Sequence, residues 1–126
     1  MRESIVYDKS LNFAERIVNL YKYMIDVKSE TVMSKQLLRC GTSIGANISE
    51  ALAAESSPDF IHKLSISQKE INETIFWLEL MRRTKYLSYE QTDSMMTDCN
   101  ELKKMISSIF LHLPSWNLYA KQLLDT

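Results

Sequence analysis

The chain has 126 residues, of which 45% are hydrophobic and 25% charged, a composition typical of one globular domain that excludes disordered, collagen-like and low-complexity proteins. Fifteen Lys and Arg oppose sixteen Asp and Glu, and the net charge of -1 provides no global field toward nucleic acid or anionic lipid. Residues 1–12 lack the continuous apolar stretch of a secretory signal, and no segment reaches the ~18 apolar residues of a membrane span. We therefore expect a cytoplasmic protein without membrane contact.

Helical periodicity dominates the whole chain. Only two Gly and two Pro interrupt it, and apolar residues recur between them every three or four positions. The expected helices span about 10–27, 30–55, 58–85 and 89–113, and an apolar tail follows over 115–126. Because short connections favour antiparallel neighbours, the sequence predicts an all-α, up-down four-helix bundle that forms one domain over residues 1–126.

The first two expected helices have clear core stripes. In the first, the stripe consists of Phe13, Ile17, Leu20, Met24 and Val27. In the second, the seam consists of Leu37, Cys40, Ile44, Asn47, Ala51 and Ala54. Small residues stand beside this second seam at every fourth position, where a neighbouring backbone can approach closely: Gly41, Gly45, Ser49 and Ala53.

The third and fourth expected helices begin with recognisable start signals. Ser57 can cap the third, Pro58 suits its first position and Asp59 favours the positive end of its dipole. Its seam is interrupted by polar residues and consists of Phe60, Leu64, Ser67, Ile71, Thr74, Leu78 and Met81. Ser88 and Gln91 have capping-box spacing. The fourth seam consists of Met95, Cys99, Leu102, Ile106, Ile109 and Leu113, before Pro114 ends the helix.

The tail over residues 115–126 is too apolar to remain in water. It carries Trp116, Leu118, Tyr119, Leu123 and Leu124. We expect it to dock either in a groove of its own bundle or on a neighbouring subunit, and the sequence leaves both alternatives open.

The residues required for common bundle chemistry are missing from the sequence. Carboxylate-bridged metals need two Glu-x-x-His pairs and two further Glu, whereas the two histidines here are His62, three residues after Asp59, and His112. The motifs of serine hydrolases, zinc proteases and phosphate-binding loops are also absent. Cys40 and Cys99 lie on apolar seams and are interpreted as buried thiols. We therefore expect no catalytic residue, metal, cofactor or small-molecule substrate.

Polar residues nevertheless cluster on the apolar faces of the second and third helices: Ser43, Asn47, Glu50, Ser67, Glu70 and Glu73. Leaving a buried polar group without a partner costs about 1–3 kcal/mol. We therefore expect Asn47, Ser67 and Glu70 to bond one another or the helix backbone. We interpret the cluster as structural, with Asn47 fixing register and oligomeric state, and a ligand site is the alternative.

At these positions the sequence resembles the four-helix-bundle proteins encoded in intervening sequences of bacterial 23S ribosomal RNA, also called S23 ribosomal proteins. The first matching motif comprises residues 36–39 (Gln-Leu-Leu-Arg) and 43–50 (Ser-Ile-Gly-Ala-Asn-Ile-Ser-Glu). The second comprises residues 59–61, 69–74, 77–80 and 86–87. The likeness spans all four helices. The chain departs from the family at Lys85, where Gly is usual, and at Ser67, where Ala is usual.

The resemblance implies a homopentameric barrel of bundles and no known catalytic activity. A branch of similar proteins, the accessory variability proteins of diversity-generating retroelements, binds a reverse transcriptase and nucleic acid through a strongly basic surface. That basic character is missing here. The one candidate nucleic-acid patch consists of Arg82, Arg83, Lys85, Lys103 and Lys104, and a solvated helix face is the simpler interpretation.

The sequence therefore predicts a non-enzymatic, self-assembling interaction module whose further partner is a protein or an RNA. The alternative is a nucleic-acid-binding accessory factor to a reverse transcriptase or ribosomal RNA.

Overall fold

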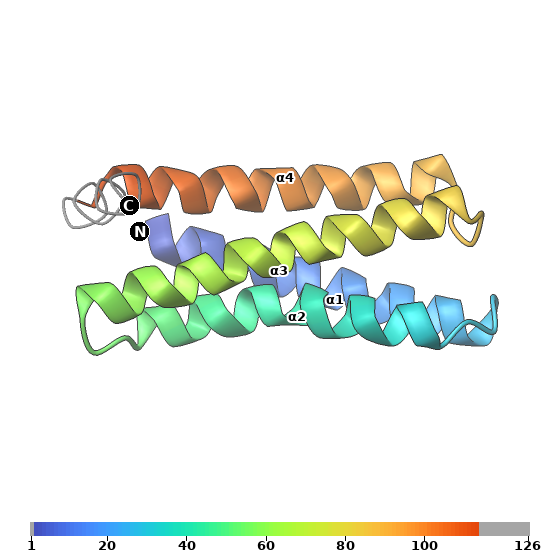
Figure 1. The fold of residues 1–126 in the computed structure, drawn as a ribbon, viewed down its shortest axis with the longest axis horizontal. Helices are drawn as coiled ribbons and strands as arrows, with labels where there is room; N and C mark the ends of the chain where they lie inside the picture. Colours follow the sequence, from blue (N-terminus) through green and yellow to red (C-terminus); the bar gives the residue numbers. More distant parts are fainter. Residues whose placement is uncertain (1, 114–126) are drawn as a thin grey trace, which may run out of the picture.

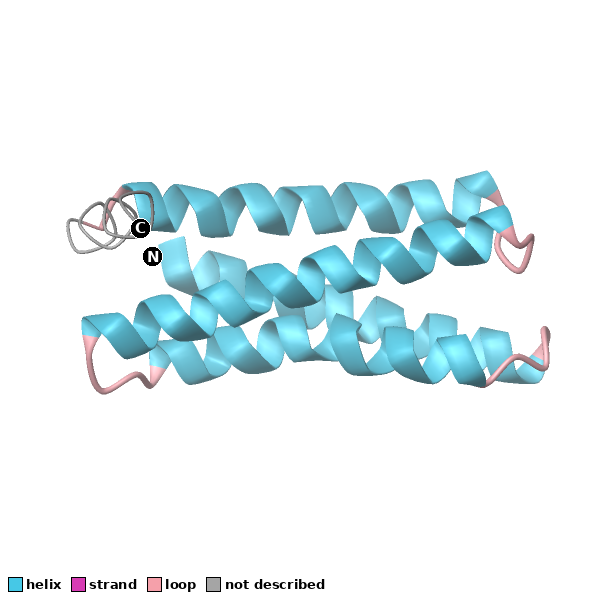
Figure 2. Cartoon of the chain, viewed as in Figure 1, coloured by secondary structure: helices cyan, strands magenta, loops and turns pink. Residues whose placement is uncertain are grey.

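The computed structural model describes residues 2–113, which form four helices and no strand. The helices are α1 (Arg2–Asp26), α2 (Val32–Leu52), α3 (Ser57–Arg83) and α4 (Tyr89–Leu111). Each helix packs against the next one in sequence, and α1 also packs against α4, so the four helices form an up-down-up-down bundle (Figure 1). The connections between them are short (Figure 2). The expected tail over 115–126 lies outside the described residues. No helix within residues 2–113 is long and apolar enough to cross a membrane.

The first helix begins at Arg2, well before the predicted start at residue 10. Val6 and Ser10 are 1% and 0% exposed and extend the core stripe one turn or more toward the N-terminus. Charged residues between these positions interrupt the apolar pattern in the sequence. One of them, Lys9, pairs with Glu101 of α4 at the bundle surface. At the other end the prediction was also wrong for Val27, which is 63% exposed because α1 ends at Asp26.

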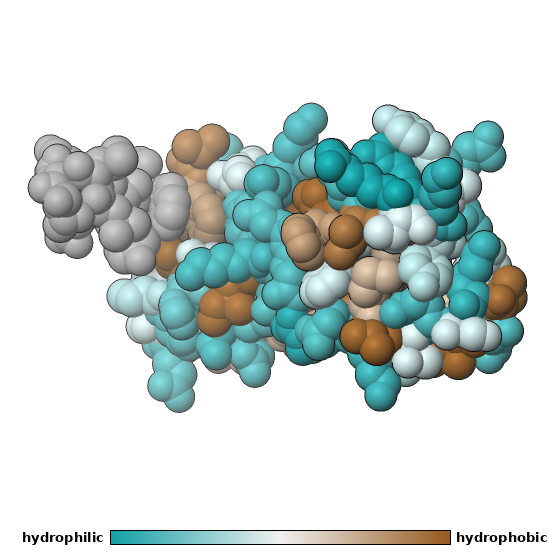
Figure 3. All heavy atoms as spheres, turned by 45° about the vertical axis from the view of Figure 1, so that its right-hand side comes forward, coloured by the Kyte–Doolittle hydropathy of each residue, from teal (hydrophilic) through white to brown (hydrophobic). Residues whose placement is uncertain are grey.

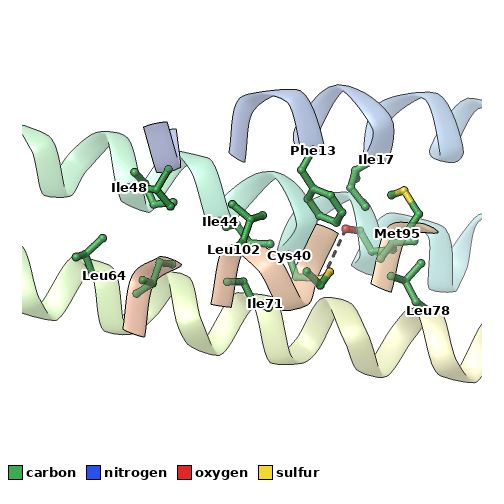
Figure 4. Close-up of a cluster of buried hydrophobic side chains, with 14 of the residues drawn as sticks. Phe13, Ile17, Cys40, Ile44, Ile48, Leu64, Ile71, Leu78, Met95 and Leu102 are labelled. Carbon is green, nitrogen blue, oxygen red and sulfur yellow. Dashed lines mark hydrogen bonds between the residues drawn. The ribbon is translucent and has the colours of Figure 1, made fainter. Parts of the chain in front are cut away.

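Side chains from all four helices meet in one core (Figure 4). Most of the predicted seam residues are buried there, including Phe13, Ile44, Ile71 and Leu102. In the predicted seam of α2 only Asn47 was misplaced among its buried turns, because it is half-buried whereas its neighbour Ile48 is buried; Ala51 is buried as predicted. An α-helix has 3.6 residues per turn and drifts by roughly 20° per heptad from a strict 3.5-residue repeat, and this drift favours position 48 over 47.

Two glycines let α1 and α2 approach closely. A Cβ atom at Gly41 would lie 2.8 Å from Ile17 Cγ1, and one at Gly45 would lie 2.9 Å from Ser10 Oγ. Ser49 and Ala53 were predicted to share this role, but both are exposed in the chain. The reason is again helical geometry, since four-residue steps rotate away from a contact after two turns.

Side-chain hydrogen bonds cap the N-termini of three helices. The Glu30 carboxylate accepts hydrogen bonds from the backbone N–H groups of Val32, Met33 and Ser34 at 3.0, 2.9 and 3.0 Å, and from the Ser34 hydroxyl at 2.6 Å. The capping box of α4 is confirmed, with Ser88 and Gln91 bonded reciprocally at 3.1 and 2.8 Å. For α3 the predicted cap was one residue late.

The cap of α3 is Ser56, whose hydroxyl accepts from the Asp59 backbone N–H at 3.2 Å. At its other end, α3 closes with backbone bonds from Tyr86 to Met81 and from Lys85 to Arg82, each 3.0 Å. This pair of bonds is a Schellman motif, which places the residue after the helix in the left-handed region. Lys85 occupies that position with φ 67°.

We expect Glu30→Gln to destabilise the fold by roughly 0.5–2 kcal/mol near neutral pH. Burial raises the pKa of Glu30, but the hydrogen bonds from Ser34, Met33 and Val32 outweigh it and hold that pKa below the ordinary value of a glutamate. The contribution is therefore complete above the pKa of an unfolded glutamate and is lost as the pH falls through the lower folded pKa. Denaturant unfolding across this range should show a smaller acid loss for the variant. Equal pH dependence in both proteins would contradict the role, and Asp8→Asn at an exposed α1 position beyond the first turn is the control.

We expect Lys85→Gly to raise the free energy of unfolding by about 1 kcal/mol, because the left-handed region costs a side-chain-bearing residue about 1–2 kcal/mol and Gly loses part of this gain to backbone entropy. Urea unfolding measures the change. Lys85→Ala is the matched control, since it removes the charge and keeps the unfavourable backbone. If Ala and Gly at this position give equal stability, the backbone strain has no energetic consequence.

Candidate functional site

The polar residues singled out in the sequence lie along the contact between α2 and α3, which is the most extensive helix contact in the bundle. At its middle, the Arg39 guanidinium of α2 pairs with Glu73 of α3 and lies 3.4 Å from Glu70 Oε2. The indole N–H of Trp77 donates to Glu73 at 3.3 Å. Arg39 and Trp77 were not among the predicted site residues, although both belong to the motifs that carry the family resemblance.

The remaining polar residues bond the helix backbone or a single opposite charge. Ser67 donates to the Ile44 carbonyl across the α2–α3 contact at 2.7 Å, and Asn47 donates to the Ser43 carbonyl within α2 at 2.9 Å. These two match the expectation, whereas Glu70 pairs with the Arg39 side chain.

Glu50 pairs with Lys63 at 3.0 Å, and the Ser43 hydroxyl donates to the Arg39 carbonyl at 2.7 Å. Among the described residues, every buried side-chain nitrogen or oxygen has a hydrogen-bond partner. Glu70, Glu73 and Ser43 therefore meet at Arg39, whereas Asn47, Glu50 and Ser67 have partners elsewhere, so the six predicted residues do not form a single site.

Both cysteines are buried, as predicted. Burial raises the pKa of Cys40 to about 11 and that of Cys99 to about 12. Thiols with such pKa values are protonated near neutral pH and react slowly, because the thiolate is the nucleophile. Cys40 Sγ lies 3.3 Å from the Thr74 hydroxyl oxygen of α3, so it takes part in the α2–α3 contact.

The two histidines lie on exposed parts of the bundle. His112 Nδ1 is 2.7 Å from the Ser108 carbonyl oxygen, one turn earlier. Within residues 2–113 no three His, Cys, Asp or Glu side chains come together in a way that could hold a metal ion.

The predicted basic patch divides into two separate groups. At the end of α3, Arg82 and Arg83 both pair with Glu79, at 2.9 and 3.4 Å, and Arg82 lies 4.5 Å from the centre of the Tyr89 ring. Lys85 is exposed just beyond them.

Lys103 of α4 bonds Asn72 Oδ1 at 3.0 Å, and Lys104 follows it on the same helix. Asn72 precedes Arg82 by ten residues on α3, which places the two groups about 15 Å apart along the helix axis. The sequence could not reveal this separation, because it depends on the register between α3 and α4.

Exposed apolar side chains are a second feature that the sequence analysis missed. The face drawn in Figure 3 shows several separate hydrophobic patches within a mostly hydrophilic surface. Leu11 on α1 is 48% exposed and lies beside Ala14 and Val18 in a shallow hollow, and Phe76 on α3 is 56% exposed. The sequence does contain a pattern that predicts the exposed apolar face of α1, namely a second apolar stripe one position after the core stripe.

Comparison with known proteins agrees with this architecture. Residues 2–108 match the family described as 23S rRNA-intervening sequence protein. A crystal structure of a protein of unknown function from the S23 ribosomal protein family of Bacteroides thetaiotaomicron VPI-5482 is 56% identical, with a TM-score of 0.85 over 86% of this chain and 97% of that one. No curated protein matches the chain. The chain thus belongs to the 23S rRNA-intervening sequence protein family.

Proposed function

We propose that this protein is a non-enzymatic interaction module that assembles with copies of itself into a closed ring, with the five subunits that the family resemblance implies. The observation that carries the proposal is the position of its exposed apolar side chains. Leu11 lies on α1 and Phe76 on α3, and these two helices are diagonally opposed in the bundle and do not pack against each other. The apolar side chains on α1 and those on α3 therefore cannot cover each other within one chain.

Each face has more than one apolar residue. Leu11 has Ala14 and Val18 beside it on α1, and the Phe76 ring packs edge-on against Trp77 with ring centres 5.1 Å apart. Single exposed apolar residues are ordinary, but aromatic residues are enriched in the contacts between subunits. Two unlike faces on opposite sides of a subunit favour head-to-tail contacts, which close into a ring when the rotation permits.

The polar pairs along α2 and α3 support a structural role. Their hydrogen bonds are satisfied within the chain, and the two thiols are held in the protonated form. Neither group supplies a nucleophile or a general base poised for chemistry. Asn47, half-buried on α2, donates to the Ser43 carbonyl of its own helix, so it lies on neither of the two apolar faces and supports packing within the chain.

We expect light scattering at micromolar concentration to give about five times the 14.7 kDa chain mass. Leu11→Glu and Phe76→Glu should each dissociate the assembly without unfolding the chain, because both side chains are about half exposed. Val32→Glu is the matched control, since Val32 is 76% exposed and lies elsewhere, at the start of α2. A monomeric wild-type protein would refute self-assembly.

Mixing the two dissociated variants tests whether unlike faces meet. Each variant retains one intact face, so a mixture should form a dimer of the two chains that neither variant forms alone. A mixture that stays monomeric would show that the two unlike faces do not associate. Homodimers formed by either variant alone would show that its intact face pairs with its own copy.

We expect at most weak, sequence-independent binding of nucleic acid, because affinity scales with the number of phosphates neutralised and Arg82 and Arg83 already pair with Glu79. Titration of structured RNA and single-stranded DNA at low and physiological salt measures it. Replacing Arg82, Arg83 and Lys85 with Glu should abolish the residual binding. Tight binding that persists at physiological salt and survives these substitutions would instead favour the nucleic-acid accessory role.

A further inference from the structure

An open groove lies at the end of the bundle where α1 begins and α4 ends. Its volume is about 390 Å³, within the range of roughly 300–1,000 Å³ found for sites that hold organic molecules. Its lining includes Ser4 of α1, Ala51 and Leu52 of α2, Ala54 of the following link, Phe60 of α3, and Leu113. The wall is therefore built from the ends of three helices and from the last residue that the structure describes.

Large apolar side chains are exposed at this same end. Leu52 is 47% exposed in the groove wall, and Ile5 of α1 and Leu111 of α4 are 51% and 70% exposed. Burying apolar surface contributes roughly 25 cal/mol per Å². This end of the bundle would accordingly gain stability from an apolar cover.

The chain itself provides such a cover. Thirteen residues, 114–126, follow Leu113. They include Trp116, Leu118, Tyr119, Leu123 and Leu124, against only two charged side chains, Lys121 and Asp125. Leu113 lines the groove, and because each residue spans at most about 3.3–3.6 Å, the three residues from Leu113 to Trp116 span at most roughly 11 Å.

We propose that residues 114–126 of the same chain cover this groove, with Trp116 inserted against Leu52 and Phe60. The covalent connection at Leu113 gives the tail a high effective concentration at its own groove, which favours it over a tail from another copy. The covered groove completes the core at the open end of the bundle, and it does so whether or not copies of the chain assemble.

Tryptophan fluorescence tests the proposal, because the chain has only two tryptophans. In the Trp77→Phe protein, Trp116 is the single emitter. We expect its emission to be blue-shifted and shielded from acrylamide. Leu52→Lys in the groove should raise the quenching of Trp116 to that of the urea-unfolded chain, whereas Val32→Lys, at the opposite end of α2, should leave it shielded. A lysine at the C-terminal end of α2 also suits the helix dipole, and circular dichroism verifies the fold.

Ala54→Lys, in the link beyond α2, blocks the same groove without changing a helix. It replaces Leu52→Lys in this experiment if the Leu52→Lys protein does not fold. Trp116 that is quenched in the parent protein as strongly as in urea would overturn the proposal. Shielding that survives both groove substitutions would overturn it too, because the tail would then dock elsewhere.

Complementation distinguishes the chain's own groove from that of another copy. Chains that carry Trp77→Phe and Leu52→Lys are refolded together with chains that carry Trp77→Phe and Trp116→Ser, so that all fluorescence comes from the groove-blocked chains. We expect Trp116 to remain quenchable in the mixture. Recovered shielding would show that the tail occupies a neighbour's groove and would overturn the assignment to its own chain.

Discussion

α2 is packed tightly between two neighbours, and the rest of the bundle is arranged around this constraint. Toward α1, Gly41 and Gly45 leave no room for a Cβ atom, so the two helices approach closely. Toward α3, the contact contains polar groups, but Ser67 bonds the Ile44 carbonyl and Thr74 lies against Cys40. Small side chains thus allow close packing on both sides of α2, and the longer side chains of α3 and α4 fill the remaining core. Enlarging any of these small residues would force α2 away from a neighbour.

Ion pairs on the outer surface contribute more to the register between neighbouring helices than to the free energy of unfolding. Arg39 joins α2 to Glu70 and Glu73 of α3, while Lys9 and Arg16 of α1 pair with Glu101 and Asp98 of α4. Most of these side chains are a third to a half exposed, and exposed ion pairs typically contribute about 0–1 kcal/mol. Their value lies in opposing a sliding of one helix along the next, because a shift would separate charges that are paired in the present register.

The interior of the bundle and its surface differ in which groups have partners. Inside the bundle, the described polar side chains are bonded and the thiols are protonated. Outside it, the groups that lack a cover are apolar: the faces of α1 and α3 and the groove at the open end. An apolar surface recognises other apolar surfaces and performs no bond chemistry. The chain belongs to a family whose solved relative has unknown function.

The sequence by itself determined the helical class, the order of four helices, the capping box of α4 and most of the core, because these depend on local periodicity and local hydrogen bonds. Tertiary structure decided the features that depend on register. In α2, helical drift places Ile48 in the core in place of Asn47. In α1, Val6 and Ser10 are buried because neighbouring helices cover them. The α3–α4 register separated Lys103 from Arg82. The pairing of Arg39 with Glu73 and the groove beside Leu113 also required the fold, since residues far apart in sequence meet only after packing brings their helices together.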